Sequence, residues 1–270
     1  SFLEDSGYLP RLAVLSDNIM HRLGMHGMSI IPMMLGLGCN VPAALSTRMM
    51  DTKRERFIAA TLMAIAVPCM AQIAMVVGLL GKHGAAGLWI VFTTLFAVWI
   101  VLGVILNKVM GGESTEMFLE IPPYRFPYLP GLVKKIWMRI VWFIKEGVPW
   151  IMVGIFIANI LHTFGIIEII ANLARPVICG ILGLPIDAAG ALLIGFLRKD
   201  VAVGMLAPLN LTPAQLIVAS VVLTMYFPCV ATFSILLKEL GIRDMLKATG
   251  IMIVCSLLVG GLLNLILGQI

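Results

Sequence analysis

The sequence predicts an all-α polytopic membrane protein with inverted repeats and re-entrant or broken helices, and three observations predict it. Of the 270 residues, 60% are hydrophobic and only 12% are charged, with a mean hydropathy of +1.04. Some apolar runs are long enough to cross a bilayer, whereas others are shorter and contain glycine and proline. The motif Pro-Cys-x-Ala occurs twice, in segments that we expect to run in opposite directions.

The composition excludes a soluble globular domain, which is typically about 45–50% apolar and about 25% charged. So much apolar surface leaves too few polar residues to cover a water-exposed exterior, and lipid must therefore be part of the solvent. The net charge of +5 comes from Lys and Arg at the ends of apolar runs, as in Lys53–Arg56 and Lys134-Lys135. Because no contiguous basic stripe with aromatic residues occurs, we expect membrane anchoring and no nucleic-acid partner.

Four apolar segments are long enough to span a membrane, because a helix of about 20 residues crosses a hydrocarbon core of about 30 Å. They are Phe57–Leu80, Gly87–Leu106, Gln215–Leu237 and Ala248–Leu267. A fifth segment, Val148–Phe164, is slightly short but adequate. Other apolar stretches are broken by glycine and proline, which membrane depth tolerates only inside protein or beside a water-filled cavity. We expect re-entrant hairpins there, at Ser29–Thr47, Ile166–Leu184 and Ile186–Leu209.

The middle of the chain is more polar. Gly111–Gly131 contains several prolines, which rule out a continuous helix. Leu132–Lys145 combines basic residues with tryptophan and phenylalanine, as in an amphipathic helix at the membrane interface. We therefore predict a first repeat at 1–110 (a re-entrant hairpin and two transmembrane helices), a polar loop with an interfacial helix at 111–146, and a second repeat at 147–270.

The loops richest in Lys and Arg are expected on the cytoplasmic side, and they lie at Thr47–Arg56, Lys108–Lys145 and Lys238–Lys247. The helix at 57–80 then runs outward and the helix at 215–237 runs inward. Their cysteines, Cys69 and Cys229, lie 160 residues apart (229 minus 69). Inverted repeats of this kind are typical of transporters, whose binding sites form at discontinuous helices near the bilayer midplane.

Each of these cysteines follows a broken segment, since Cys39 lies 30 residues before Cys69 and Asp200 lies 29 residues before Cys229. Cys39 and Asn40 are at the predicted break of the first hairpin. Gly38 permits backbone that a helix does not, and Pro42 suits the first turn of a following helix. The thiol and the amide would line a gap in which a cation exchanges water for protein ligands. The alternative is an apolar packing role for Cys39 and an N-cap role for Asn40.

Pro68 and Pro228 each precede a cysteine in the middle of a predicted span. Each proline frees the carbonyl group four residues earlier, those of Ala64 and Thr224. A thiol beside a free carbonyl group suits softer transition metals and does not suit Mg or Ca. The alternative is a simple proline kink with a space-filling cysteine.

Asp200 follows Arg198 and Lys199 inside an apolar segment. A charge at the bilayer centre costs about 2.5–3.5 kcal/mol, so such residues are usually functional. Asp200 would balance a neighbouring cation or face a cation path, unless the cluster emerges into water at a hairpin tip. Gln72 and Thr232, each three residues after a cysteine, are secondary candidates for oxygen ligands or for hydrogen bonds to a neighbouring helix.

Signatures of enzymes are missing from the sequence. It contains no GxxxxGK[ST] phosphate loop, no GxSxG elbow and no HExxH motif. The four histidines have no partner at metal-ligand spacing, and we expect them in loops or at the interface. We therefore predict no catalytic residue, no enzyme activity and no cofactor in this chain.

Five motifs extend over essentially the whole chain, and their order is characteristic. They are Glu4–Arg11, Gly38–Ala43 with Thr47-Arg48, Glu120–Arg125, Arg198–Ala202, and Tyr226–Thr232 followed by Lys238–Gly241. Together they resemble the permease portion of the ferrous-iron transport protein B family. The family's gate cysteines map onto Cys39 and Cys229. Cys69 corresponds to the first gate, where many members carry a different Ser- and Cys-containing motif.

The resemblance implies a multi-pass importer of Fe(II) in a prokaryotic inner membrane, with two pore-forming gate repeats. It also implies an N-terminal domain that holds GTP and Mg and lies outside this chain. The chain starts at Ser1 rather than Met, and we expect a fragment or, alternatively, one subunit of a split transporter. Expected partners are the lipid bilayer, Fe(II), the GTP-binding domain, small accessory proteins of the same system and a second copy in a homo-oligomer.

Two alternatives stay open from the sequence. A permease of the same gate architecture would carry another divalent metal or a nucleoside-like solute, and a solute site should show more convergent polar groups. A non-transporting membrane scaffold is the second alternative, although a scaffold needs neither broken helices nor charges inside the membrane. The favoured hypothesis is a path for Fe(II) lined by Cys39, Asn40, Cys69, Cys229 and Asp200.

Overall fold

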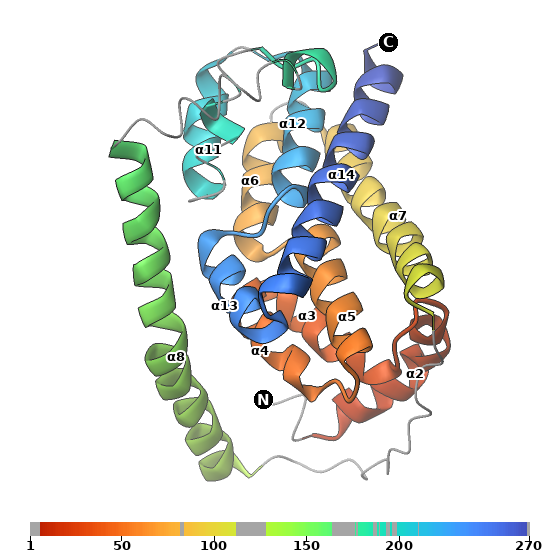
Figure 1. Cartoon of the computed structure of the whole chain (residues 1–270), viewed down its shortest axis with the longest axis vertical. Coiled ribbons are helices and arrows are strands. Elements are labelled where there is room, and N and C mark those ends of the chain that lie inside the picture. Colours follow the sequence, from red (N-terminus) through yellow and green to blue (C-terminus); the bar gives the residue numbers. More distant parts are fainter. Residues whose placement is uncertain are drawn as a thin grey trace.

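The computed structural model describes residues 6–81, 84–111, 128–163, 176, 178–185, 188, 190–192, 195, 199–209 and 211–268 (Figure 1). All regular elements in these ranges are helices, so the all-α prediction is confirmed for them. Most of the polar segment expected at Gly111–Gly131 and most of the hairpin expected at 166–184 lie outside the described residues. The end of the polar segment is helical, since Pro130 lies in the first turn of the helix Leu129–Thr163.

Four helical stretches are long and apolar enough to cross a membrane, and they contain the four spans that the sequence predicts. Two of them are single helices of 26 residues, α7 (Ala85–Met110) and α14 (Ile242–Leu267). The other two are interrupted pairs, α5 (Lys53–Ala66) with α6 (Met70–Leu80) and α12 (Pro213–Met225) with α13 (Val230–Leu240). In Figure 1, α5 and α13 lie toward one end of the molecule and α6 and α12 toward the other, so the two pairs run in opposite directions.

Proline explains both interruptions. Pro68 and Pro228 have no N–H to donate four residues back, and the chain is non-helical for a few residues around each of them. The helix resumes at once because Cys69 and Cys229 adopt the extended backbone of an N-cap, with φ −76°, ψ 167° and φ −60°, ψ 156°.

A third break lies in the N-terminal part of the chain. Its elements are α2 (Tyr8–Arg22), the 3₁₀ turn η1 (Gly27–Ser29), α3 (Ile30–Gly38), α4 (Asn40–Ser46) and the 3₁₀ turn η2 (Thr47–Met49). The broken segment expected at 29–47 is therefore present, and Pro42 lies in the first turn of α4. The break is at Cys39, with φ −151° and ψ 129°. Gly38 is helical, so the expectation that its own backbone makes the break is wrong.

One long helix corrects a further expectation. The interfacial helix expected at 132–145 and most of the span expected at 148–164 form one helix of 35 residues, α8 (Leu129–Thr163), with Pro149 inside it. An interior proline costs about 3 kcal/mol but removes only one hydrogen bond, and helical turns on both sides propagate past it. α8 packs against α13. The division of the chain near residues 146 and 147 stays a prediction.

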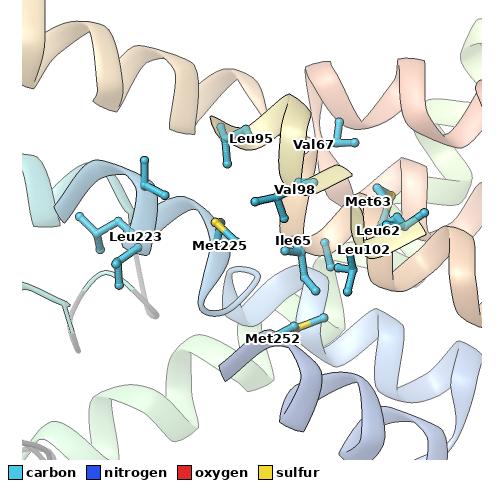
Figure 2. Packing of buried hydrophobic residues seen from close by; sticks show 14 of the residues in the cluster. Leu62, Met63, Ile65, Val67, Leu95, Val98, Leu102, Leu223, Met225 and Met252 are labelled. Carbon is cyan, nitrogen blue, oxygen red and sulfur yellow. The ribbon is translucent and has the colours of Figure 1, made fainter. Parts of the chain in front are cut away.

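The interrupted pairs lie at the centre of the bundle and the single helices lie outside them. In the most apolar stretches of Lys53–Leu80 and Pro213–Leu240, 61% and 72% of the residues are buried. The corresponding shares for α7 and α14 are 28% and 22%. Figure 2 shows the core between these four spans, with side chains that include Met63, Leu95, Leu223 and Met252. The two breaks therefore lie in the most buried spans, and α7 and α14 leave broad faces for lipid.

Two short helices complete the centre. α11 (Lys199–Leu206) and the 3₁₀ turn η4 (Ala207–Leu209) precede α12. α11 packs against α6, whereas α4 packs against α13. Each short helix therefore contacts the second half of the opposite interrupted pair.

An ion pair between an exposed arginine and a largely buried carboxylate joins the two halves of the chain. Arg48 of η2 donates from Nε to Oε2 of Glu239 at 2.7 Å and from Nη2 to the other carboxylate oxygen. The side chain of Glu239 is only 5% exposed. Its carboxylate therefore depends on Arg48 to replace the water that it loses.

We expect Arg48→Met to lower the apparent melting temperature of the protein in detergent, because it leaves the buried Glu239 without its partner, at about 2 kcal/mol. Asp244→Asn is the matched control. Its 3.0 Å bridge to Lys247 joins side chains that are 43% and 69% exposed, and such pairs contribute below about 1 kcal/mol. Equal shifts in thermal unfolding for the two variants would contradict a structural role for the Arg48 pair.

Candidate functional site

Two cysteines occupy the same position in the two interrupted pairs. Cys69 is the N-cap of α6 and Cys229 is the N-cap of α13, and both are half-buried. The first N–H groups of a helix have no partner within it and give this end a partial positive charge. The thiolate is the form of cysteine that binds metals.

The structure brings three of the predicted residues together. Cys39, which is exposed in the break between α3 and α4, lies within electrostatic range of Cys229 and Cys69. The packing of α4 on α13 and of α6 on α12 accounts for this proximity. Residues that are up to 190 positions apart (229 minus 39) therefore lie in the same region of the bundle.

The carbonyl group of Thr224 lies at the centre of this arrangement. Pro228 cannot donate to it, as the sequence predicts, so it has no partner in its own helix. Two side chains donate to it instead, Gln72 through Nε2 at 3.0 Å and Lys199 through Nζ at 3.4 Å. A carbonyl oxygen with several donors in reach is a site where cations and N–H groups compete for the same lone pairs.

Gln72 links the two interruptions directly. Its Oε1 accepts a hydrogen bond from the backbone N–H of Cys69 at 2.8 Å, while its Nε2 donates to Thr224. The amide is therefore engaged as a bridge between helices in this conformation, and its oxygen is not free to bind a cation. Thr232, at the equivalent position in the other pair, is buried, and its Oγ1 lies 3.2 Å from Sγ of Cys229.

Lys199 is the buried charge of the site. Its side chain is 6% exposed, and the ammonium group lies within electrostatic range of Cys229 and Cys69. The alternative of a water-exposed hairpin tip is therefore wrong for Lys199. Asp200 is the second residue of α11, and its side chain lies outside the described part of the structure.

Asn40 is the first residue of α4 and is 5% exposed. Among the described residues its Oδ1 finds no hydrogen-bond partner, although it is buried. The oxygen lies beside α3, since a Cβ added to Gly36 would come within 3.3 Å of it. An unpaired buried acceptor costs about 1–3 kcal/mol, and functional sites are one place where proteins tolerate that cost.

These groups do not form a metal cage. Within the described ranges no cluster of three or more His, Cys, Asp or Glu side chains is arranged to hold a metal ion. The available donors are thiols, one amide oxygen and one backbone carbonyl group, spread over the breaks. Such a set provides several weak positions for a cation and no single tight one.

Two family models cover most of the chain. The gate model, described as "Nucleoside recognition", matches residues 1–83 and 145–243, and the model described as "Ferrous iron transport protein B C terminus" matches residues 88–139. The chain belongs to the ferrous iron transport protein B family. It corresponds to the membrane portion of that family, and its gate region contains Cys39, Cys69 and Cys229.

Family members described as "Fe(2+) transporter FeoB" are similar over much of the chain. The one from Methanocaldococcus jannaschii is 28% identical over 278 residues, covering 89% of this chain and 42% of the relative. The one from Staphylococcus aureus (strain COL) is 29% identical, covering 88% and 40%. The one from Escherichia coli (strain K12) is 34% identical over 164 residues, covering 58% and 21%. The chain thus spans about two-fifths or less of these relatives. No solved structure matches it.

Sequence reasoning about this member of the ferrous iron transport protein B family missed three buried ionisable side chains, Lys199, His26 and Glu55. The sequence favoured Asp200 over Lys199 as the functional residue of this cluster. The burial of the Lys199 side chain makes it a candidate as well. His26, expected in a loop or at the interface, is 3% exposed, and its Nε2 lies 3.5 Å from Oε2 of the buried Glu55. No periodicity marks any of the three residues, because burial of a charge depends on helices far away in sequence.

We expect Gln72→Leu to destabilise the protein by about 2 kcal/mol, because it removes the acceptor of the Cys69 N–H and one donor to Thr224. Gln215→Leu is the matched control, since Gln215 also makes a capping bond and donates to Gly183 at 3.1 Å, but from a more exposed position. Thermal unfolding in detergent measures both. A larger loss for Gln215→Leu would contradict the central role of Gln72.

Proposed function

We propose that this chain is the permease part of a GTP-dependent Fe(II) transporter and that it moves Fe(II) inward across the membrane. One observation carries the proposal: Cys39, Cys69 and Cys229 approach one another at three breaks in the centre of the bundle. Thiolates favour transition metals over Mg and Ca. Broken helices at membrane depth are the usual place for transport sites.

The proposal includes two gate repeats of inverted topology, which further correspondences support. Gly24 and Gly183 both have positive φ, at +78° and +64°, and each packs against an asparagine, Asn107 and Asn264. The offsets are 159 (183 minus 24) and 157 (264 minus 107), close to the 160 that separates the two motif cysteines. A shared offset at independent positions is what a duplicated unit produces.

The same offset relates the two short helices of the site. At the 160-residue offset of the motif cysteines, Lys199 of α11 corresponds to Cys39, which directly precedes α4 (199 minus 39). α11 packs on α6 of the first half of the chain, and α4 packs on α13 of the second half. A two-fold axis in the membrane plane relates two such contacts to each other. The proposed path thus has a thiol on one side and an ammonium group at the corresponding place on the other.

Fe(II) would lose part of its water at the breaks and bind thiolates, the Asn40 oxygen and the Thr224 carbonyl group in turn. Asp200 is a further candidate ligand of this path, and Thr232 orients Cys229. Conduction requires sites that are strong enough to replace water and weak enough to release the ion. The lack of a metal cage among the described residues suits this requirement.

Lys199 acts in this proposal as a tethered cation. Its ammonium group donates a hydrogen bond to the Thr224 carbonyl group, near Cys69 and Cys229. In the proposal, a metal ion would bind the same carbonyl group. Entry of Fe(II) therefore requires the ammonium group to move away or to lose its proton. Such a group keeps the path closed to cations that bind more weakly than Fe(II).

A nucleoside carrier of the same gate architecture is less well supported. The site contains thiols and a cation, but few of the convergent hydrogen-bonding groups that an organic solute needs. The proposal further places the GTPase activity, with its GTP and Mg, in another domain of the full-length protein. It also includes accessory proteins of the transport system, a possible second copy and a prokaryotic inner membrane as the location.

We expect the double variant Cys39→Ala/Cys229→Ala to reduce Fe(II) uptake by full-length protein in proteoliposomes at least about tenfold, because a tenfold loss needs only about 1.4 kcal/mol of lost binding or barrier stabilisation. Cys255→Ala is the matched control, since Cys255 lies on α14 away from the breaks. Uptake by the double variant at the wild-type rate would refute the proposed path.

We expect Lys199→Met to lower the Fe(II) concentration for half-maximal uptake about tenfold, because removal of a like charge at an effective dielectric constant near 20 is worth more than about 1 kcal/mol. Lys199→Arg keeps the charge and is the control, with a smaller change expected. An unchanged half-saturating concentration in Lys199→Met would show that the ammonium group does not compete with the metal.

A further inference from the structure

A groove of about 880 Å³ lies between α5, α7 and α14, away from the breaks. Along most of its length it is lined by apolar side chains, among them Phe57, Leu102, Leu106, Ile251 and Leu258. α7 and α14 are the spans with the least buried surface. The groove therefore opens sideways toward the region that the acyl chains of the bilayer occupy.

One end of the groove is basic. Lys53, Arg54 and Lys247 line it, with Asp244 as the acidic residue, so this end has a net charge of +2 (three cations minus one acid). α5 and α14 both begin at this end and α7 finishes there, in loops that the sequence predicts to be cytoplasmic. The cations thus lie at the headgroup level of the inner leaflet.

The cations are only partly satisfied by the protein. Arg54 donates from Nη2 to Oδ1 and to the carbonyl oxygen of Asn107 at 2.5 and 3.4 Å, and from Nη1 to the carbonyl oxygen of Gly24 at 3.4 Å, so it contributes mainly its charge. Lys247 pairs with Asp244 at 3.0 Å and is 69% exposed. Lys53 is exposed. Donors therefore remain for an anionic group held at the mouth of an apolar channel.

We propose that this groove binds an anionic phospholipid of the cytoplasmic leaflet. The phosphate lies among Lys53, Arg54 and Lys247, and an acyl chain lies between α7 and α14. A cationic end joined to an apolar trough is complementary to an anionic amphiphile, whereas a soluble anion would gain nothing from the trough. The lipid joins the start of α5, the helix that leads to Cys69, to the start of α14. This site is independent of the metal path.

Native mass spectrometry of the full-length protein in mild detergent tests the headgroup end. Phosphatidylglycerol is added in competition with phosphatidylcholine, and preferential retention of phosphatidylglycerol is expected. Each basic residue near an anionic surface changes binding roughly fivefold, so Lys53→Ala/Lys247→Ala should reduce retention roughly 25-fold. Arg243→Ala removes one positive charge near the start of α14, where Lys247 also lies, but Arg243 does not line the groove. It should leave retention unchanged, whereas Lys247→Ala alone should reduce retention roughly fivefold.

A second variant tests the apolar trough. Gly250 lines the groove, and a Cβ added there meets nothing within 4 Å. Gly250→Leu should therefore fold, fill the trough and abolish lipid retention, whereas Gly250→Ala should keep it. Equal retention of the two lipids, equal losses in Arg243→Ala and in the double variant, or full retention in Gly250→Leu would each overturn the proposal. A protein segment that fills the groove gives no retention, which also overturns it.

Discussion

The free carbonyl group of Thr224 is the constraint on which the centre of the structure depends. Pro228 cannot donate to it, so α12 ends there and the carbonyl group must find another donor inside the bundle. Gln72 and Lys199 supply two donors, from α6 and α11. The same bonds hold both helices against α12. Local backbone chemistry thus determines where distant parts of the chain meet.

A broken helix is costly in lipid for the reason that makes it useful for transport. Lipid offers no hydrogen bonds, so a free carbonyl group at membrane depth must be surrounded by protein. Among the four spans, only the two central pairs are interrupted, and the outer spans are continuous. In the most apolar stretches of the two central pairs, 61% and 72% of the residues are buried. The groups that protein shields from lipid at the breaks are also those that can replace water around a cation.

Much of this organisation could be predicted from the sequence, because length and proline act locally. The four spans follow from apolar runs, and the interruptions at Pro68 and Pro228 follow from their missing N–H groups. Pro149 obeys the same rule, yet α8 continues through it. The difference comes from tertiary contacts, because the carbonyl group freed by Pro228 accepts hydrogen bonds from Gln72 and Lys199. A proline alone therefore does not determine whether a helix is interrupted. The burial of Lys199 depends on packing with α6, which a sequence pattern does not encode.

The most direct test of the shared path is Cd(II) binding to the full-length protein, followed by the ultraviolet absorption of the Cd–thiolate bond. Cd(II) is a soft ion that binds thiolates from both halves of the chain if they are close enough. The account predicts Cd–thiolate absorption to which both breaks contribute, so that it falls clearly in Cys69→Ser alone and also in Cys229→Ser alone. Absorption that either single variant leaves unchanged would contradict the claim that the two breaks face one path.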